Sequence, residues 1–352
     1  MAFATTSRRP AAPALRAVTA LALLAATLTG CAAPAATVEQ NPYYTTDPTD
    51  AFPVTVTHRY GDAVIPAEPQ RVVVVGVTEQ DILLELGVTP IATTEWYGEQ
   101  PFATWPWATA LLGEAEPVVL SQSDGFEFEK IAALKPDLIV GPNAGMSQED
   151  YDKFTTIAPT ISSLPHAEAY FSDWQEQTRL IAAAVGRSAL GEELIKGVDQ
   201  AHADAAAAHP EFAGLTATFS QGAPWEGNLY VYPDGLNTDF LTELGFTMTQ
   251  GLEKYAADPG AQALISAENT GLIDADVIVF ATESEASLAE LLKFGTISDL
   301  SAVKGKRAVY TDDVLAGAIY FLSPLSQKYV IERLTPLLAA AVKGESPQSL
   351  QG

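Results

Sequence analysis

The sequence predicts an α/β protein built from two similar lobes. Short β-branched runs, RVVVVG (71–76) and DVIVFA (276–281), are typical of strands buried in a parallel sheet. Single helices separate such runs along the chain, which indicates parallel pairing. Between the two sets of strands lies a helical stretch, 188–208, which at 1.5 Å per residue spans roughly 30 Å. The predicted fold class is therefore two Rossmann-like lobes with parallel-rich central sheets, joined by one long rigid helix.

The N-terminus predicts export. Three arginines accompany an apolar run of about 14 residues, 15–28, which is the length of a signal-peptide core. The run leads into LTGC, and Cys31 is the only cysteine in the chain. This ending resembles the lipobox of bacterial lipoproteins, in which the cysteine becomes the lipidated N-terminus. The alternatives are an ordinary signal peptide, or twin-arginine export, which Pro10 directly after the arginine pair disfavours.

Residues 1–30 are accordingly expected to be a lipoprotein signal peptide, and 31–52 a lipid-anchored flexible tether rich in Ala, Pro, Thr and Asp. Cleavage before Cys31 removes three arginines and no acid, so the net charge of −25 becomes −28. This charge excludes nucleic acid as a partner. After Cys31 no apolar run approaches the roughly 20 residues of a membrane-spanning helix. We therefore expect an extracytoplasmic protein anchored to the cell membrane by lipid only.

Strands and helices are expected to alternate in both lobes. In the N-terminal lobe, 53–171, the predicted strands are 71–76, 89–94, 137–141 and 159–164, and the predicted helices are 78–86, 128–134 and 147–157. Residues 172–209 are expected to form the connecting helices. In the C-terminal lobe, 210–344, the predicted strands are 216–220, 228–232, 276–281 and 307–311, and the predicted helices are 237–244, 265–273, 287–294 and 326–342, before a tail at 345–352.

The segment ATTEWYGEQPFATWPWA (92–108) carries three of the five tryptophans. Pro101 and Pro106 exclude a central strand, so the segment is predicted to be a loop. It leaves the carboxyl end of strand 89–94, and ligands of open α/β sheets bind outside those ends. Its rings therefore either fold back onto the protein or form the wall of a ligand cleft.

Several segments resemble one protein family. FEKIAALKPDLIVG (128–141), ADVIVFAT (275–282), NAGMSQEDYDKFTTIAPTI (143–161) and SPLSQKYVIERLTPLLAAAV (323–342) are similar to the class III periplasmic binding proteins of iron-siderophore and cobalamin importers, and more closely to their ferric-siderophore branch. The resemblance implies a binding protein without enzyme activity or cofactor. It would capture ferric iron as a siderophore chelate between its lobes and act as a monomer.

The partner implied by the resemblance is an ABC permease dimer driven by an ATPase. Family members engage arginines of the permease with one surface glutamate per lobe. Residue-by-residue matching places these at Glu129 and Glu268. The alternative is an exposed first-turn acid favoured by the helix dipole.

Aromatic residues on loops at strand ends are the predicted ligand contacts. Together with one amide side chain, they are Trp96, Tyr97, Trp105, Trp107, Asn143, Trp225, Tyr232 and Tyr320, the last in a loop before the final helix. Each could instead pack in the core, and at least one of the loop tryptophans is expected to hold the 92–108 loop in place. Aromatic walls suit a bulky chelate because they bury its hydrocarbon at about 25 cal/mol per Å².

Other chemistry finds little support. The four histidines, His58, His166, His202 and His209, form no ligand set with metal-site spacing, so no metal site is expected. His202 and His209, seven residues apart on the predicted long helix, are predicted to be solvated. The nucleophile-elbow, P-loop, dinucleotide-binding and HExxH motifs are absent from the sequence. A secreted hydrolase that uses an acidic cleft is the alternative from a different class.

Charge narrows the expected ligand. The loops predicted to face the cleft hold almost no Lys or Arg, and five acids, Glu79, Glu95, Glu99, Glu226 and Glu283, lie near them. Such a pocket repels an anionic chelate, so a hydroxamate or mixed-type ferric siderophore is expected. The alternatives within the same class are haem, ligated by Tyr97, Tyr232 or Tyr320, and cobalamin.

Overall fold

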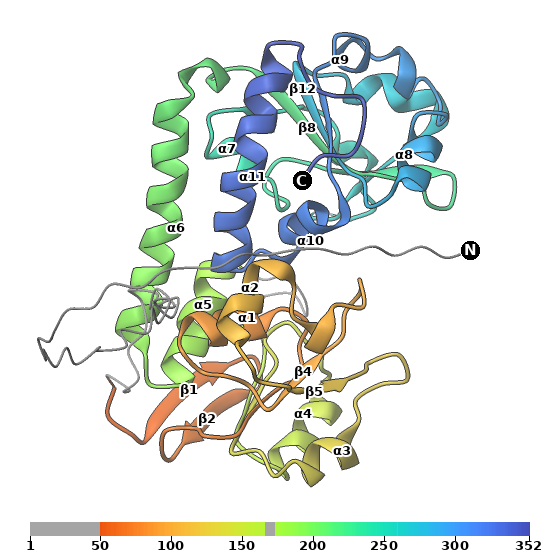
Figure 1. The fold of residues 1–352 in the computed structure, drawn as a ribbon. Coiled ribbons are helices and arrows are strands. Elements are labelled where there is room, and N and C mark those ends of the chain that lie inside the picture. Colours follow the sequence, from red (N-terminus) through yellow and green to blue (C-terminus); the bar gives the residue numbers. More distant parts are fainter. Residues whose placement is uncertain (1–49, 166–172, 259) are drawn as a thin grey trace, which may run out of the picture. The chain divides into compact units, whose positions relative to one another are not determined.

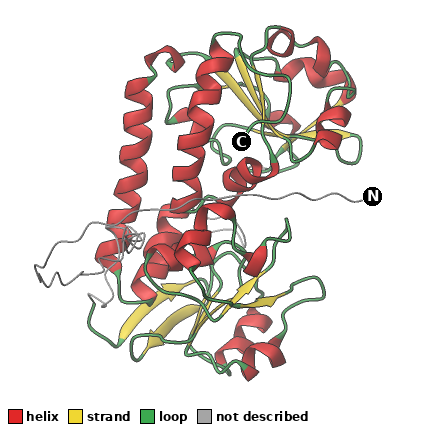
Figure 2. Ribbon diagram, in the orientation of Figure 1, coloured by secondary structure: helices red, strands yellow, loops and turns green. Residues whose placement is uncertain are grey.

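The computed structural model describes residues 50–165, 173–258 and 260–352. The predicted signal peptide, the lipidation site Cys31, most of the tether and His166 lie outside these residues. Within the described residues, two α/β lobes are present (Figures 1 and 2), as the sequence predicted. None of the helices in this part of the chain is long and apolar enough to cross a bilayer.

The N-terminal lobe is built on a five-stranded parallel sheet with strand order β5-β4-β3-β6-β7, preceded by an antiparallel hairpin, β1-β2. Its strands are β1 (Val54–His58), β2 (Gly61–Ile65), β3 (Val72–Val74), β4 (Ala92–Thr94), β5 (Val118–Leu120), β6 (Leu138–Val140) and β7 (Thr160–Ile161). Its helices are α1 (Glu79–Glu85), η1 (Pro101–Ala103), α2 (Pro106–Leu112), α3 (Phe128–Ala133) and α4 (Gln148–Thr155). The sequence analysis missed the hairpin, β5 and α2.

The C-terminal lobe has a mixed sheet of order β11-β9-β8-β12-β13, with β10 also pairing β8. Its strands are β8 (Thr216–Gln221), β9 (Asn228–Tyr232), β10 (Thr247–Met248), β11 (Ala263–Ser266), β12 (Val277–Ala281) and β13 (Ala308–Tyr310). Its helices are η2 (Pro210–Phe212), α7 (Asp239–Thr242), η3 (Glu253–Tyr255), η4 (Ala267–Ile273), α8 (Glu285–Leu291), η5 (Ile297–Asp299), α9 (Ser301–Lys304), α10 (Asp313–Phe321) and α11 (Pro324–Val342). β9 runs antiparallel to β8 and β11, whereas β12 is parallel to β8 and β13.

The connection consists of α5 (Trp174–Ala184) and the predicted long helix, α6 (Ser188–Ala208). The helix α11 runs beside α6 and also contacts α1 and α2 of the N-terminal lobe (Figure 1). The two lobes are therefore tied by a second long helix that the sequence analysis assigned to the C-terminal lobe alone.

Two predicted elements are wrong. Tyr320 and Phe321 end helix α10 rather than lying in a loop, because Asp312 caps the helix by accepting from the Leu315 backbone N–H at 2.8 Å. The predicted helix 265–273 is a strand followed by a 3₁₀-helix, since Ala263–Ser266 pairs antiparallel with β9.

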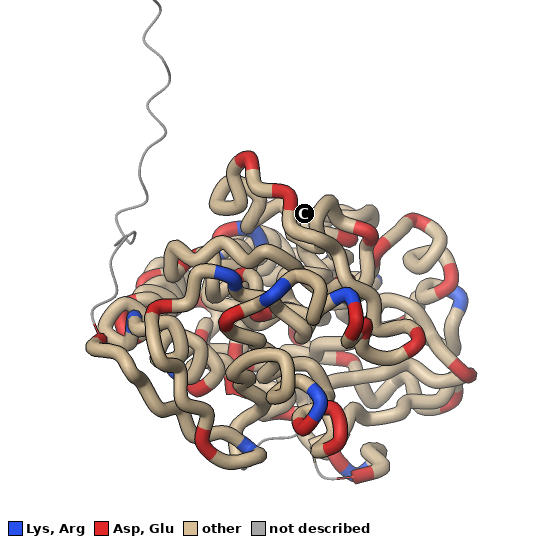
Figure 3. Tube along the Cα trace, turned by 90° about the horizontal axis from the view of Figure 1, so that it is seen from below, with Lys and Arg blue, Asp and Glu red and all other residues tan. Residues whose placement is uncertain are grey.

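Acidic positions are scattered over the described chain and outnumber basic ones (Figure 3), in keeping with the net charge. The few basic side chains include Arg179, which pairs with Glu192 at 2.7 Å on the connecting helices.

Candidate functional site

The first half of the 92–108 loop faces a cavity. Trp96 and Tyr97 directly follow β4, and their rings meet edge-to-face with centroids 4.7 Å apart. They form one wall of a cavity of about 670 Å³, which we call the main cavity. Its other walls come from the C-terminal lobe: Gln221 at the end of β8, Tyr232 at the end of β9, Leu236, Asn237, Gly260, Ala261, Gln262, Glu283 and Tyr320 of α10.

A smaller cavity of about 270 Å³ shares Gln221, Glu283 and Tyr320 with the main cavity. We call it the side cavity. Trp225, on the turn between β8 and β9, forms its outer wall and is 66% exposed. Gln221 at the end of β8 and Glu283, two residues after the end of β12, thus line both cavities, as expected for an open α/β sheet.

Three phenols line the main cavity. The rings of Tyr320 and Tyr232 lie with their centroids 6.5 Å apart. Burial raises the pKa of Tyr232 to about 12 and the pKa of Tyr320 well above its usual value. Burial, reinforced by the charge of Glu283, also raises the pKa of Tyr97. All three side chains are therefore neutral hydrogen-bonding groups at physiological pH.

Glu283 is the charged residue of both linings. Of the residues that the structure describes, no Lys or Arg lines either cavity. The Glu283 side chain is accessible at the cavity, and partial burial, then the nearby charge of Asp313, raises its pKa. The other acids that the sequence placed near the site lie outside both linings, and Glu79 is fully buried.

The second half of the 92–108 loop is packed away from the cavities. Trp105 is 2% exposed and stacks on Trp107 with ring centroids 5.1 Å apart and an interplanar angle of 13°. Both rings also meet Phe321 of α10, at 5.8 and 5.2 Å. A Cβ at Gly317 of α10 would lie 2.6 Å from the Trp105 ring, so only glycine permits this approach. Trp105 therefore holds the loop against the opposite lobe.

Polar contacts join the lobes at the same place. The Asp81 carboxylate of α1 accepts from Trp107 Nε1 at 2.7 Å and from Ser323 Oγ at 2.6 Å, and Lys328 Nζ donates to Glu85 Oε1 at 2.8 Å. We call the set Trp105, Trp107, Phe321 and Gly317, with Asp81, Ser323, Glu85 and Lys328, the interlobe joint. Burial raises the pKa of Asp81 to about 7, although both donors oppose this shift.

Asn143 is buried and lines neither cavity. It is 1% exposed, its Nδ2 donates to Thr78 Oγ1 at 3.0 Å, and its backbone N–H donates to Glu79 Oε1 at 2.6 Å. Burial raises the pKa of Glu79 to about 7. The structure thus brings together Trp96, Tyr97, Tyr232 and Tyr320 in the main cavity and Trp225 in the side cavity, and separates Trp105, Trp107 and Asn143 from them.

Several lining residues were missed by sequence reasoning. Gln221 ends β8, so the rule that ligands bind at the carboxyl ends of strands could have found it. Leu236, Asn237 and the 260–262 segment come from irregular chain after β9 and β10, where no local pattern marks an approach to a cavity.

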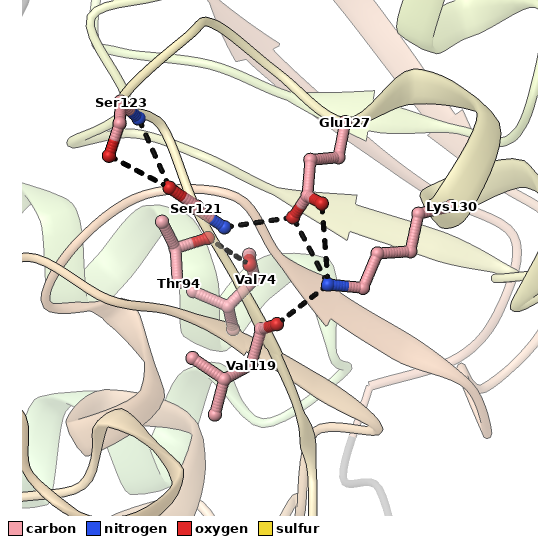
Figure 4. Close-up of polar contacts among 7 residues, drawn as sticks. All are labelled: Val74, Thr94, Val119, Ser121, Ser123, Glu127 and Lys130. Carbon is pink, nitrogen blue, oxygen red and sulfur yellow. Dashed lines mark hydrogen bonds and ion pairs between the residues drawn. The ribbon is translucent and has the colours of Figure 1, made fainter.

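Glu129 and Glu268 are exposed, each in the first turn of its helix, α3 and η4. The chain before α3 is fixed by Glu127, which accepts from the Ser121 backbone N–H at 2.9 Å, and by Lys130, which donates to Val119 O at 2.8 Å (Figure 4). Ser266 Oγ donates to Glu268 at 2.9 Å and lowers the pKa of that carboxyl. Both acids therefore project from ordered chain.

The described residues contain no cluster of three or more His, Cys, Asp or Glu side chains that could hold a metal. The prediction of solvated histidines is wrong for His202, which is 3% exposed, with Nδ1 2.7 Å from Glu243 Oε2. It lies on the inner face of α6 because its helical spacing continues the stripe of Leu194 and Val198.

A family model described as a periplasmic binding protein matches residues 72–315, more than half of the chain. The chain belongs to this family. The chain is also similar to a Bacillus subtilis (strain 168) protein named "Probable siderophore-binding lipoprotein YfiY". The two are 30% identical over 277 residues, which cover 74% of this chain and 81% of that protein.

Solved structures agree with this assignment. A periplasmic solute binding protein from Mycobacterium smegmatis superposes with a TM-score of 0.77 at 42% identity, covering 82% of this chain and 98% of that one. PiaA of Streptococcus pneumoniae, solved in complex with ferrichrome, has a TM-score of 0.69 at 24% identity over 83% of this chain and 99% of its own, a similarity of fold.

Proposed function

We propose that this periplasmic-type binding protein captures a ferric siderophore of the hydroxamate or mixed type in the main cavity and delivers it to an ABC permease. The observation that carries the proposal is the composition of the cavity wall. Rings from both lobes enclose about 670 Å³, which is within the usual range for small-molecule sites. The polar groups of the wall include neutral phenols and one carboxylate, and none of the described lining residues is basic.

The wall fits such a chelate physically. Aromatic faces bury its hydrocarbon linkers, and phenol hydroxyls hydrogen-bond its oxygens. A trianionic catecholate would meet the charge of Glu283 without a basic residue in the described lining to offset it. The relative named as siderophore-binding and the neighbour solved with ferrichrome support the ligand class.

Haem ligation by a tyrosine finds no support in this geometry. Ligation by a phenol requires its proton to leave, and burial beside Glu283 raises the pKa of Tyr97, Tyr232 and Tyr320. We propose that the protein acts without catalysis and is tethered outside the cell membrane through lipid on Cys31, as a monomer.

Quenching of tryptophan fluorescence in the purified protein tests the ligand class. The titrants are a ferric trihydroxamate, a ferric mixed-type chelate, a ferric tris-catecholate and haemin. We expect saturable quenching by the hydroxamate or the mixed chelate at concentrations at least tenfold below those needed for the catecholate. Tight binding of the catecholate, with no binding of a hydroxamate, would contradict the proposal, and a Soret shift with haemin at stoichiometric concentration would favour haem.

We further propose that Glu129 and Glu268 dock the permease. Replacing both by alanine is expected to abolish ferric-chelate uptake in cells and leave the affinity of the purified protein unchanged. The matched control is Glu149→Ala with Glu290→Ala, which removes one exposed helical acid from each lobe. Lost ligand affinity, or equal loss of uptake in the control, would count against the assignment.

A further inference from the structure

The side cavity does not include the Trp96 and Tyr97 wall of the main cavity, but it shares Glu283, the one charged residue among the described residues of that lining. At about 270 Å³ it lies below the usual volume of a complete ligand site. It opens beside the main cavity through Gln221, Glu283 and Tyr320. Such a space suits a pendant arm of a ligand whose bulk fills the main cavity.

We infer that the side cavity is a subsite for a cationic arm of the chelate, such as a protonated primary amine, and that Glu283 and Trp225 select for it. This inference rests on the proposed function, because it adds a charged arm to the hydroxamate class proposed for the main cavity. It predicts a preference between two chelates with the same iron-binding core.

The charges around Glu283 favour a cation. The charge of Asp313 acts on Glu283, and the other ionisable groups close enough to interact with Glu283 are Tyr97, Tyr232 and Tyr320, all neutral. In the described chain no lysine or arginine forms an ion pair with either carboxylate. A ligand ammonium at this position would gain an attractive partner and relieve the repulsion between the two acids.

Trp225 supplies the second contact. Trp225 is 66% exposed, which is the highest value among the exposed large hydrophobic residues of the described chain. The turn that carries it is ordered, because Trp225 and Asn228 exchange two backbone hydrogen bonds of 2.8 and 3.0 Å. An indole held in this way presents a face to an ammonium, and tryptophan is the best cation–π partner among the side chains.

Backbone packing fixes the distance between the two selecting residues. A Cβ at Gly222 would lie 2.2 Å from Thr282 Cα, so only glycine allows the chain after β8 to touch the chain after β12. Gly222 leads into the Trp225 turn, and Thr282 directly precedes Glu283. The indole and the carboxylate therefore stand on two segments that are locked together, which is the pre-organisation a selective subsite needs.

A matched pair of chelates tests the subsite in the purified protein. Ferrioxamine B carries a free primary amine, and its N-acetylated form has the same ferric trihydroxamate core without that charge. We expect the wild type to bind the amine form about tenfold more tightly, the size of one partly desolvated cation contact. Glu283→Gln should reduce this preference to less than about twofold.

Two further variants sharpen the test. Trp225→Ala should also reduce the preference, and Glu285→Gln, which removes an exposed acid two residues from Glu283 outside both linings, should keep it. Equal binding of the two chelates by the wild type, or an unchanged preference in Glu283→Gln, would overturn the subsite and leave the proposed function standing. Failure of both chelates to bind, with another chelate class bound, would overturn the proposed hydroxamate ligand and the subsite with it.

Discussion

The main cavity and the interlobe joint both use the 92–108 loop and α10, yet they differ in what faces their rings. At the joint, Trp105 packs against Gly317 and Phe321 of the opposite lobe, and the Trp107 indole N–H donates a hydrogen bond to Asp81. At the cavity, Trp96 and Tyr97 present ring surface to an open volume. Aromatic content alone therefore does not separate a binding wall from a structural joint. The residue opposite each ring does.

Trp105→Ala tests the joint with the largest expected effect. Removing a fully packed indole leaves a void that the glycine-lined approach of α10 cannot fill, so the free energy of unfolding should fall by about 3–5 kcal/mol. Urea denaturation followed by circular dichroism measures it. A loss of less than about 1 kcal/mol would mean that the loop is not held by this residue.

Asp81→Asn tests the buried carboxylate of the joint. The folded-state pKa of Asp81, about 7, lies above its ordinary value of 3.8. Between these two pH values, Asp81 keeps its proton in the folded state but has lost it in the unfolded state. Its contribution to the free energy of unfolding is therefore complete below pH 3.8 and declines as pH rises to about 7. At 1.36 kcal/mol per pKa unit, the decline is at most about 4 kcal/mol.

Asparagine cannot titrate, and its amide oxygen can accept from both Trp107 and Ser323 as the carboxylate does. The stability of Asp81→Asn relative to wild type should therefore rise as pH goes from 4 to 8, by an amount up to that decline. Thermal melts across this range measure the difference. Glu283→Gln is the control from the cavity: because Glu283 is accessible to solvent, its profile should stay close to that of wild type, and parallel profiles for both variants would refute the buried-charge account.

The sequence was sufficient for the lobes because buried parallel strands such as Val277–Ala281 carry a local apolar signature. It also predicted that the loop leaving the carboxyl end of β4 could face a cleft, and Trp96 and Tyr97 of that loop line the main cavity. It could not assign Trp105 and Trp107 to the joint, because that assignment depends on Gly317 and Phe321, more than 200 residues away. Asn143 was misplaced for a similar reason: its hydrogen bonds to Thr78 and Glu79 hold it in the interior, and no spacing in the sequence shows that contact.

Trp96→Ala tests the cavity, where the effect on stability should be small. The Trp96 ring contacts Tyr97 and Phe321 and also lines the main cavity. We expect Trp96→Ala to lower the free energy of unfolding by about 1 kcal/mol, much less than Trp105→Ala does. A bound chelate, however, loses about 100 Å² of apolar contact, or roughly 2.5 kcal/mol, which corresponds to an affinity lower by between tenfold and a hundredfold. Isothermal titration with the ferric hydroxamate identified by quenching measures this loss without relying on the removed fluorophore. If Trp96→Ala instead destabilised the fold as much as Trp105→Ala while binding stayed intact, the two halves of the loop would play one structural role, and the distinction between cavity and joint would fail.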